Sequence, residues 1–276
     1  MITFHEQELA DISGYIKEKF GVDLTSKGTL IESRLGYYIR AKGFESYSDY
    51  FQYAKNDPSG EEMASMINRL TTNHTFFMRE NDHFEFFSKS VLPWIESLPG
   101  GNDIRVWSAG CATGEEPYGL SIYILEYMAA RGRKRAPAPG GTDTTILASD
   151  ISERALSTAS EGIYNHENLS AMPQDWISKY FTRLEGEAYR VTLELRANVA
   201  FKKINLLEPI KTTKPYHAVF CRNVMIYFDS SARSSLIDRF FNAMAPGAYL
   251  FIGHSESLTN INHGFKYVQP SVYRKP

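Results

Sequence analysis

Apolar residues recur at intervals of three and four along about the first quarter of the chain, the spacing of one face of a helix. A first helix ends at Gly21, a second ends at Gly43, and a third begins after Ser46 as its N-cap and ends before Asp57-Pro58. A fourth helix carries its apolar face on Met63, Met66, Ile67 and Leu70. The pattern therefore predicts a small all-α domain over residues 1–72, and nothing in it indicates catalysis.

From about Thr71 onward the pattern changes, and short apolar runs with β-branched residues alternate with helical patterns. The runs predict five strands: Ile104–Ser108, Ile146–Ser149, Val199–Lys203, His217–Cys221 and Tyr249–Gly253. Three helices are predicted between them: Tyr118–Tyr127, Ser152–Glu161 and Leu236–Ala245. Such alternation is typical of a mainly parallel sheet that helices cover on both faces. We therefore expect an α/β domain over residues 73–276, with Phe265–Arg274 as an antiparallel edge strand.

Two segments interrupt this alternation. Arg131–Asp143 is basic and then rich in Pro and Gly, which predicts a solvated loop; a patch that binds phosphate or RNA is the alternative. The second segment, about 164–198, has helical spacing around Trp176–Phe181 and alternating apolar residues from Tyr189 to Leu195. It predicts a small β-rich subdomain beside the sheet.

Composition excludes several classes of protein. With 43% apolar and 22% charged residues and a net charge of −2, the chain is too apolar for disorder and too poor in Gly and Pro for a fibre. No apolar run approaches the ~18–20 residues that cross a bilayer, and the first residues predict no secretory signal. Two cysteines form no disulfide framework. We expect a cytoplasmic protein with no direct membrane insertion, and a pI near 6.4 argues against a nucleic-acid partner.

The turn after the first predicted strand is the main candidate for ligand binding, because ligands of open α/β sheets bind at the carboxyl ends of strands. Gly110 and Gly114 allow positive φ angles and a close approach of the backbone to a ligand. Glu115 and Glu116 then begin a helix, where acidic side chains repel phosphate and tolerate an ammonium or sulfonium group. The turn therefore favours a cationic nucleoside such as S-adenosylmethionine over a dinucleotide. A tight turn with a solvated helix start is the alternative.

Asp150 ends the second predicted strand, in the run ILASD. An acidic residue at this position of a dinucleotide fold accepts hydrogen bonds from ribose hydroxyls. We favour that role for Asp150. The alternative is an N-cap of the following helix.

Six motifs then occur in order: TTNHTFFMRE (Thr71–Glu80), WSAGCATGEEPY (Trp107–Tyr118), ASDIS (Ala148–Ser152), NLLEP (Asn205–Pro209), CRNVMIYF (Cys221–Phe228) and GHSESL (Gly253–Leu258). With these motifs the chain resembles the CheR family, the glutamate O-methyltransferases of chemotaxis receptors, nearly from end to end. The resemblance implies a Rossmann-like S-adenosylmethionine-dependent methyltransferase sheet with a small β-subdomain insertion, preceded by an all-α N-terminal domain.

The resemblance also implies roles for individual residues. Around the cofactor S-adenosylmethionine, or its product S-adenosylhomocysteine, it places Asn73, Thr75, Arg79, Glu116, Asp150, Asn205, Leu206, Arg222 and Asn223. Within this set Glu116 would contact the methionine part, Asp150 the ribose, and Asn205 with Leu206 the adenine. Arg79 and Tyr227 would be catalytic and would face the methyl group and the substrate. The family usually reads T-x-F-F-R, whereas here Met78 precedes Arg79, which leaves open the aromatic residue that packs on the cofactor.

The reaction that the resemblance implies is methyl transfer to receptor glutamates. A glutamate with a pKa near 4.3 is ionised at neutral pH, so no general base is required. Without the resemblance, a surface ion pair for Arg79 and a core aromatic for Tyr227 would be the simpler interpretations. The seven histidines show no metal-ligand spacing, so we expect no metal.

Two other functions remain open from the sequence: a methyltransferase of similar fold with a small-molecule or nucleic-acid substrate, and a non-catalytic relative that binds the cofactor as a signal. The expected partner is the cytoplasmic domain of membrane chemoreceptors, and we expect the protein to be a monomer. Arg34, Arg40 and Lys42 give the second helix a basic face, which is either solvated or a docking site for acidic receptor helices. Whether the β-subdomain binds a receptor C-terminal peptide stays open.

Overall fold

The structure is a computed structural model that describes residues 5–20, 23–58, 60–70, 75–99, 103–133 and 146–276. The four helices expected at the N-terminus are confirmed: α1 (Glu6–Phe20), α2 (Gly28–Ala41), α3 (Tyr47–Asn56) and α4 (Glu61–Leu70). Ser46 caps α3 as predicted, since its hydroxyl accepts a hydrogen bond from the Asp49 amide. The helices bury one shared core around Ile16, Ile31 and Ile39. The predicted domain boundary between residues 72 and 73 lies outside the described residues.

A helical segment that the strand-and-helix alternation did not predict precedes the sheet. It consists of α5 (Asn81–Phe86), a π-helical turn (Phe87–Val91) and α6 (Leu92–Glu96). Phe84, Phe87 and Val91 recur at three- and four-residue spacing and are buried on one face of the sheet. The spacing was therefore present in the sequence.

The main sheet has seven strands in the order β6-β2-β1-β7-β8-β10-β9. Its strands are β1 (Val106–Ala109), β2 (Ile146–Asp150), β6 (Val199–Lys203), β7 (Tyr216–Cys221), β8 (Met244–Ile252), β9 (Lys266–Gln269) and β10 (Val272–Arg274). The first five are parallel, and β9 and β10 form an antiparallel hairpin at one edge in place of the single edge strand that was expected. Because the chain runs from β1 to β2 and β6 on one side and to β7 and β8 on the other, the strand order reverses between β1 and β7.

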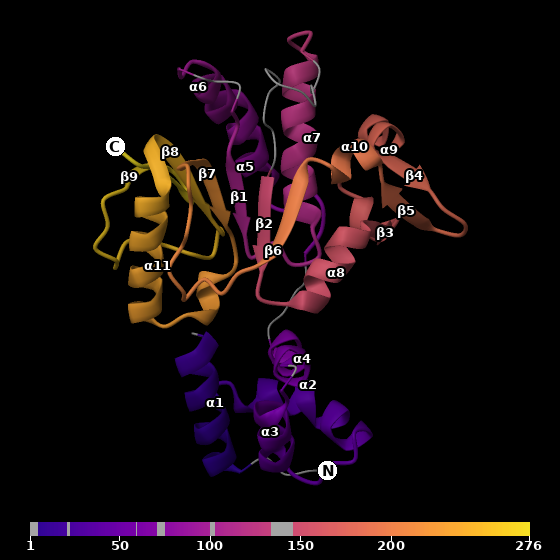
Figure 1. Ribbon diagram of the computed structural model, residues 1–276, viewed down its shortest axis with the longest axis vertical. Coiled ribbons are helices and arrows are strands. Elements are labelled where there is room, and N and C mark those ends of the chain that lie inside the picture. Colours follow the sequence, from indigo (N-terminus) through magenta and orange to yellow (C-terminus); the bar gives the residue numbers. More distant parts are fainter. Residues whose placement is uncertain (1–4, 21–22, 59, 71–74, 100–102, 134–145) are drawn as a thin grey trace.

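Helices cover both faces of this sheet, as predicted. The core on one face includes residues of α5, α6 and α7 (Glu115–Ala129), and the core on the other includes residues of α11 (Ser230–Ala243). α8 (Glu153–Glu161) connects β2 to the inserted segment. Figure 1 shows α1–α4 as a separate layer below the sheet, beside the loops that follow β6 and β2.

The insertion forms a second, three-stranded antiparallel sheet in the order β3-β5-β4. Its elements are β3 (Ile163–Asn165), a 3-10 turn (Glu167–Leu169), α9 (Gln174–Tyr180), β4 (Phe181–Arg183), β5 (Ala188–Val191) and α10 (Leu193–Arg196). The strand expected to continue to Leu195 is wrong in its second half. There Thr192 accepts a hydrogen bond from the Leu195 amide and caps α10, so a helical turn replaces the strand.

Of the basic loop Arg131–Asp143, residues 134–143 lie outside the described residues. In the part that is described, Arg131 and Arg133 form ion pairs with Glu96 at 3.0 and 2.8 Å. Among the helices of the described ranges, none combines the length and the apolar character needed to span a membrane.

Candidate functional site

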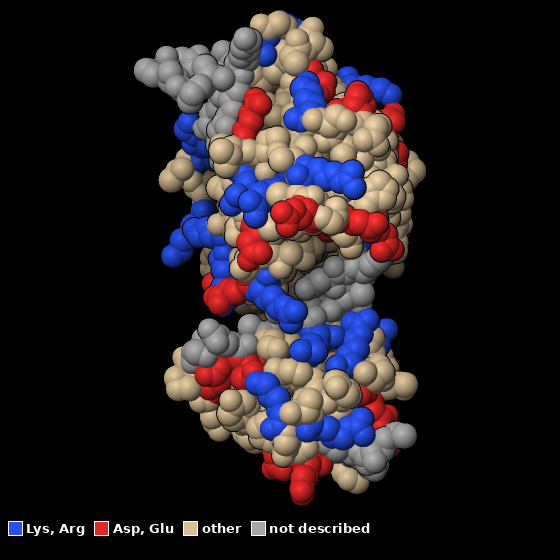
Figure 2. Space-filling view, turned by 90° about the vertical axis from the view of Figure 1, so that its right-hand side faces the viewer, with Lys and Arg blue, Asp and Glu red and all other residues tan. Residues whose placement is uncertain are grey.

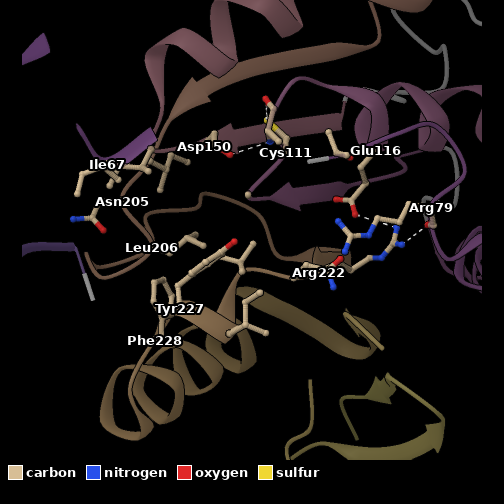
Figure 3. A pocket seen from close by; sticks show the side chains of 18 of the residues that line it. Ile67, Arg79, Cys111, Glu116, Asp150, Asn205, Leu206, Arg222, Tyr227 and Phe228 are labelled. Atoms are coloured by element: carbon tan, nitrogen blue, oxygen red, sulfur yellow. Dashed lines mark hydrogen bonds and ion pairs between the residues drawn. The ribbon is translucent and has the colours of Figure 1, made fainter. Parts of the chain in front are cut away.

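A cavity of about 400 Å³ lies at the carboxyl edge of the sheet, where the strand order reverses. The loops after β1, β2, β6 and β7 line it, together with Phe20 of α1 and Ile67 of α4. Figure 3 shows Arg79, Glu116 and Arg222 gathered at one end of this cavity and Ile67, Asn205 and Leu206 at the other. The cavity therefore has a charged end and a more apolar end.

The glycine turn after β1 takes a shape that requires glycine. Gly110 and Gly114 have φ angles of 89° and 98°, which side-chain-bearing residues rarely adopt. The amides of Gly110 and Cys111 both donate to the Ser149 carbonyl at 2.7 and 2.9 Å. The turn is thereby tied to the end of β2, and its residues Gly110, Cys111 and Ala112 line the cavity.

Asp150 lies at the end of β2 and lines the cavity beside this turn. Its carboxylate accepts hydrogen bonds from the amides of Ala112 and Ser152, both at 2.9 Å. Burial raises the pKa of this carboxyl, and the backbone hydrogen bonds act against that rise. The N-cap of α8 is Ser152, so the alternative in which Asp150 caps this helix is wrong.

Glu116 lies in the first turn of α7 at the charged end of the cavity. Its carboxylate accepts hydrogen bonds from the Ser108 hydroxyl at 2.6 Å and from Arg222 Nη1 at 3.2 Å. Burial raises the pKa of Glu116, against the charge of Arg222. Glu115 instead accepts from the Thr113 hydroxyl at 2.7 Å, so only one of the two acidic residues lines the cavity.

Arg222 follows β7 and has a side chain that is only 3% exposed. Its guanidinium lies 3.1 Å from Glu80 and 3.2 Å from Glu116, and it also donates to the Arg79 carbonyl. For Glu80, burial acts to raise the pKa, but the charge of Arg222 and the hydrogen bond from the His254 amide lower it overall. Arg222 therefore joins three segments that are far apart in the sequence.

Arg79 belongs to the short segment that enters the large domain. Met78 and Glu80, on either side of it, have φ angles of 63° and 54°, so the backbone turns sharply at this point. Thr75, Phe76 and Arg79 line the cavity. The predicted cofactor residue Asn73 lies outside the described residues.

Of the two aromatic residues before Met78, Phe76 lines the cavity and is 40% exposed. Phe77 is fully buried and packs against Tyr164 and Phe181, with ring centroids 4.9 and 5.4 Å apart. Met78 is buried as well. Phe76 is thus the aromatic residue of this segment that can contact a ligand.

The remaining predicted residues lie on two loops that face the helical domain. Asn205 and Leu206 follow β6, where Asn205 Oδ1 accepts from the Leu207 amide at 3.0 Å. Asn223 and Tyr227 follow β7 and also line the cavity. The Tyr227 carbonyl accepts from the Asp23 amide at 2.7 Å, and its side chain packs on the core of the helical domain. All predicted site residues within the described ranges therefore surround one cavity.

Sequence reasoning missed the acidic and histidine residues around Arg222. Glu80, His83 and His254 place one ligand atom each within 4.8 Å of one another. Because Glu80 is already paired with the Arg222 guanidinium, a cation at this point would face a positive charge. The signal available was the three-residue spacing of Glu80 and His83; the approach of His254 depends on the fold.

The cavity fits S-adenosylmethionine in its chemistry. The partly buried carboxylates of Glu116 and Asp150 line it and offer acceptors of the kind that a positively charged group and ribose hydroxyls require. Leu206 and Phe228 offer an apolar surface of the kind that a base requires. Beside Glu116, the Arg222 guanidinium offers N–H donors of the kind that the carboxylate of the methionine part requires.

Comparison with known proteins shows the family of this chain. Residues 73–274 match the family model described as CheR methyltransferase, SAM binding domain, and residues 7–71 match CheR methyltransferase, all-alpha domain. The chain is 35% identical to a chemotaxis protein methyltransferase of Borreliella burgdorferi, over 99% of this chain and 96% of that protein. It is 32% identical to chemotaxis protein methyltransferase 2 of Vibrio cholerae, over 100% and 95%. With the Escherichia coli chemotaxis protein methyltransferase it shares 33% identity over 95% and 88%. The chain therefore belongs to the CheR family of S-adenosylmethionine-dependent methyltransferases.

Proposed function

We propose that this protein transfers a methyl group from S-adenosylmethionine to glutamate side chains of chemotaxis receptors and so forms glutamate methyl esters. The observation that carries the proposal is the position of Arg79, a cation that lines the charged end of the cavity beside Glu116 and Arg222. An arginine there suits an incoming carboxylate. The family relationship supports the same reaction.

In this proposal the receptor glutamate arrives ionised, so no protein base has to remove a proton. One carboxylate oxygen forms a bond to the methyl carbon, and the carbon–sulfur bond breaks with its electron pair left on sulfur. Arg79 holds the carboxylate in line with that bond, and Tyr227 restricts its second oxygen. Because an anion and a cation neutralise each other, exclusion of water by Phe76 and Tyr227 favours the transfer.

The other residues hold the cofactor. Glu116 accepts from its ammonium group, Asp150 accepts from the ribose hydroxyls, and Asn205 with Leu206 flanks the adenine. Arg222 and Asn223 close the cavity beside Glu116. Asp150 has a second task, since it also holds the Ala112 amide of the glycine turn.

The basic face of α2 is part of the proposed contact with the receptor, but two of its three basic side chains already have partners on another helix of the helical domain. Lys42 pairs with Glu62, and Arg34 donates to the Leu70 carbonyl at 2.8 Å, so both side chains also serve the helical domain. Arg40 is exposed and donates to the Gly36 carbonyl of its own helix. Figure 2 shows basic side chains on the part of the helical domain that adjoins the sheet domain.

The test is methyl transfer from labelled S-adenosylmethionine to receptor-containing membranes, with release of the label by base as the mark of an ester. For Arg79→Ala we expect kcat to fall about 10²-fold or more while cofactor affinity changes little. For Asp150→Ala we expect the cofactor Kd to rise about 10- to 100-fold, the effect of a lost hydrogen bond to a charged group. Arg154→Ala, which removes an exposed arginine of α8, serves as the matched control.

Unchanged kcat in Arg79→Ala would contradict the proposal. Label that enters only a small molecule or RNA would favour a different substrate, and tight cofactor binding with no acceptor labelled would favour a non-catalytic relative.

A further inference from the structure

The loop from Arg222 to Tyr227 carries site residues but little regular structure. It leaves β7 through Asn223, whose φ of 59° is unusual for a residue with a side chain, and contains only a 3-10 turn at Met225–Tyr227. Such a loop exposes backbone amides that no helix or strand satisfies. The partner of these amides therefore decides where Arg222 and Tyr227 lie.

That partner is the carboxylate of Glu256, in the turn after β8. Its Oε2 accepts from the amides of Asn223 at 3.0 Å and Gly253 at 2.6 Å, and its Oε1 accepts from the amide of Ile226 at 3.2 Å. Glu256 is not among the residues that line the cavity, so its effect on the site passes through the loop. One side chain thus joins the ends of two parallel strands.

A glutamate suits this position better than any neutral side chain. An ionised carboxylate offers acceptor sites on both oxygens, whereas an amide replaces one oxygen with a donor that would face an N–H group. Burial raises the pKa of Glu256, and the amides of Gly253, Asn223, Ile226 and Met225 act in the opposite direction. The backbone amides thus favour the charged carboxylate.

The packing around Gly253 shows how closely the two segments meet. A side chain at Gly253 would place its Cβ 2.8 Å from the Asn223 amide nitrogen and 2.4 Å from its Nδ2. On the other side of the loop, Val224 lies against Gly110 of the glycine turn, where an added Cβ would approach its Cγ2 to 2.3 Å. The loop is therefore held between the ends of β8 and β1.

We propose that Glu256 is a positioning residue for methyl transfer, which fixes the Arg222–Tyr227 loop and thereby sets Arg222 and Tyr227 against the cofactor and the substrate. This inference rests on the proposed function of the cavity. It assigns Glu256 no contact with either ligand.

The test compares Glu256→Gln with Glu256→Asp in the full chain. In Glu256→Gln an acceptor is lost and a donor gained, so we expect kcat to fall about 10²-fold, as for a misplacement of about 1 Å at a reacting centre, with a smaller rise in the cofactor Kd. In Glu256→Asp the carboxylate is kept, and we expect recovery of a substantial part of kcat. Glu153→Gln, which removes an exposed carboxylate paired with Lys203, should leave both constants unchanged.

Circular dichroism and thermal unfolding establish the folded fraction of each variant. A Glu256→Gln protein that is folded, or merely less stable, and keeps the wild-type kcat and Kd would overturn the inference. Should Glu256→Gln fail to fold, Gly253→Ala decides, because it displaces Asn223 and leaves the carboxylate in place. Wild-type kcat in Gly253→Ala would count against the inference.

The two proposals fail in different ways. If the wild-type protein labels no receptor glutamate, the proposed function is wrong. The effect of Glu256→Gln on the cofactor Kd and on hydrogen exchange of the Asn223 and Ile226 amides still tests the role of Glu256, since Arg222 and Asn223 line the cavity.

Discussion

His83 is a fully buried ionisable side chain in a crowded, charged setting. Its Nδ1 lies 3.6 Å from Glu80, and its ring centroid lies 4.8 Å from that of His254. Burial, followed by the charge of Arg222, lowers the pKa of His83 to about 4, against the opposing charges of Asp82 and Glu80. A protonated His83 is therefore disfavoured in the folded protein.

This setting makes stability depend on pH. Between the unfolded pKa near 6.5 and the folded pKa near 4, the unfolded chain binds more protons, so stability falls as the pH falls. From pH 7 to pH 5 we expect His83 to account for a loss of about 2 kcal/mol in the free energy of unfolding. Urea unfolding of wild type and His83→Gln at both pH values measures it, with the exposed His166→Gln as control. Equal losses in wild type and His83→Gln would contradict the expectation.

At the scale of elements, the glycine turn between β1 and α7 and the loop after β7 pack on each other because β1 and β7 are neighbours. The two segments touch at Gly110, which has a φ of 89°. A Cβ added there would lie 2.3 Å from Val224 Cγ2. Gly132, in the turn after α7, has a φ of 64° but nothing within 4 Å of its Cβ position. Comparison of alanine substitutions at the two glycines therefore distinguishes the cost of backbone strain, which both share, from the cost of steric overlap, which only Gly110 has.

We expect Gly110→Ala to destabilise the protein by about 2–5 kcal/mol, of which about 1–2 kcal/mol is the cost of the left-handed backbone and the rest is overpacking. Gly132→Ala should show only the backbone cost. Adding Val224→Ala to Gly110→Ala should recover the overpacking part alone. Denaturant unfolding measures the free energy of unfolding of the wild type and of these three variants. Equal effects of Gly110→Ala and Gly132→Ala would refute the packing argument.

At the scale of the whole molecule, the helical layer and the sheet meet around the cavity. The Asp23 amide donates to the Tyr227 carbonyl, Lys17 lies 3.4 Å from Asp229, and Ile67 lines the cavity. Lys17 and Asp229 are about a third exposed, so solvent screens that ion pair and it stabilises the contact between the layers only weakly. We expect a cofactor that contacts both walls of the cavity to be the stronger link between the layers.

We therefore expect S-adenosylmethionine at about 100 times its Kd to stabilise the helical domain along with the sheet, by up to about 2.7 kcal/mol. Hydrogen exchange should slow in α4 as well as around Asp150, by as much as about 10²-fold for amides that exchange through global unfolding. Asp150→Ala at the same cofactor concentration should reduce this protection in both places to about 2- to 10-fold, because its Kd is expected to be about 10- to 100-fold higher. Protection confined to the sheet would show that the helical domain opens independently of the cofactor site.

Local spacing was sufficient for most elements, because a helical or strand period depends on residues only a few positions apart. The prediction from spacing failed at Thr192, where alternating apolar residues predicted a strand. There the Thr192 side chain caps a helical turn, and the strand ends. In Asn81–Glu96, a helical segment interrupted by a π-helical turn, the helical spacing of Phe84, Phe87 and Val91 was present but was not used in the prediction.

The sequence by itself determined the two kinds of domain, the glycine turn, Asp150 at a strand end and, through its motifs, the family. Only the tertiary structure decided the partners of those residues. Arg222 meets Glu80 across 142 positions, and Asn223 meets Glu256 across 33. These contacts depend on the order of strands in the sheet, which long-range pairing sets and no local pattern contains. For the same reason, only the fold brings His254 to His83 and places helical-domain residues in the wall of the cavity at the sheet edge.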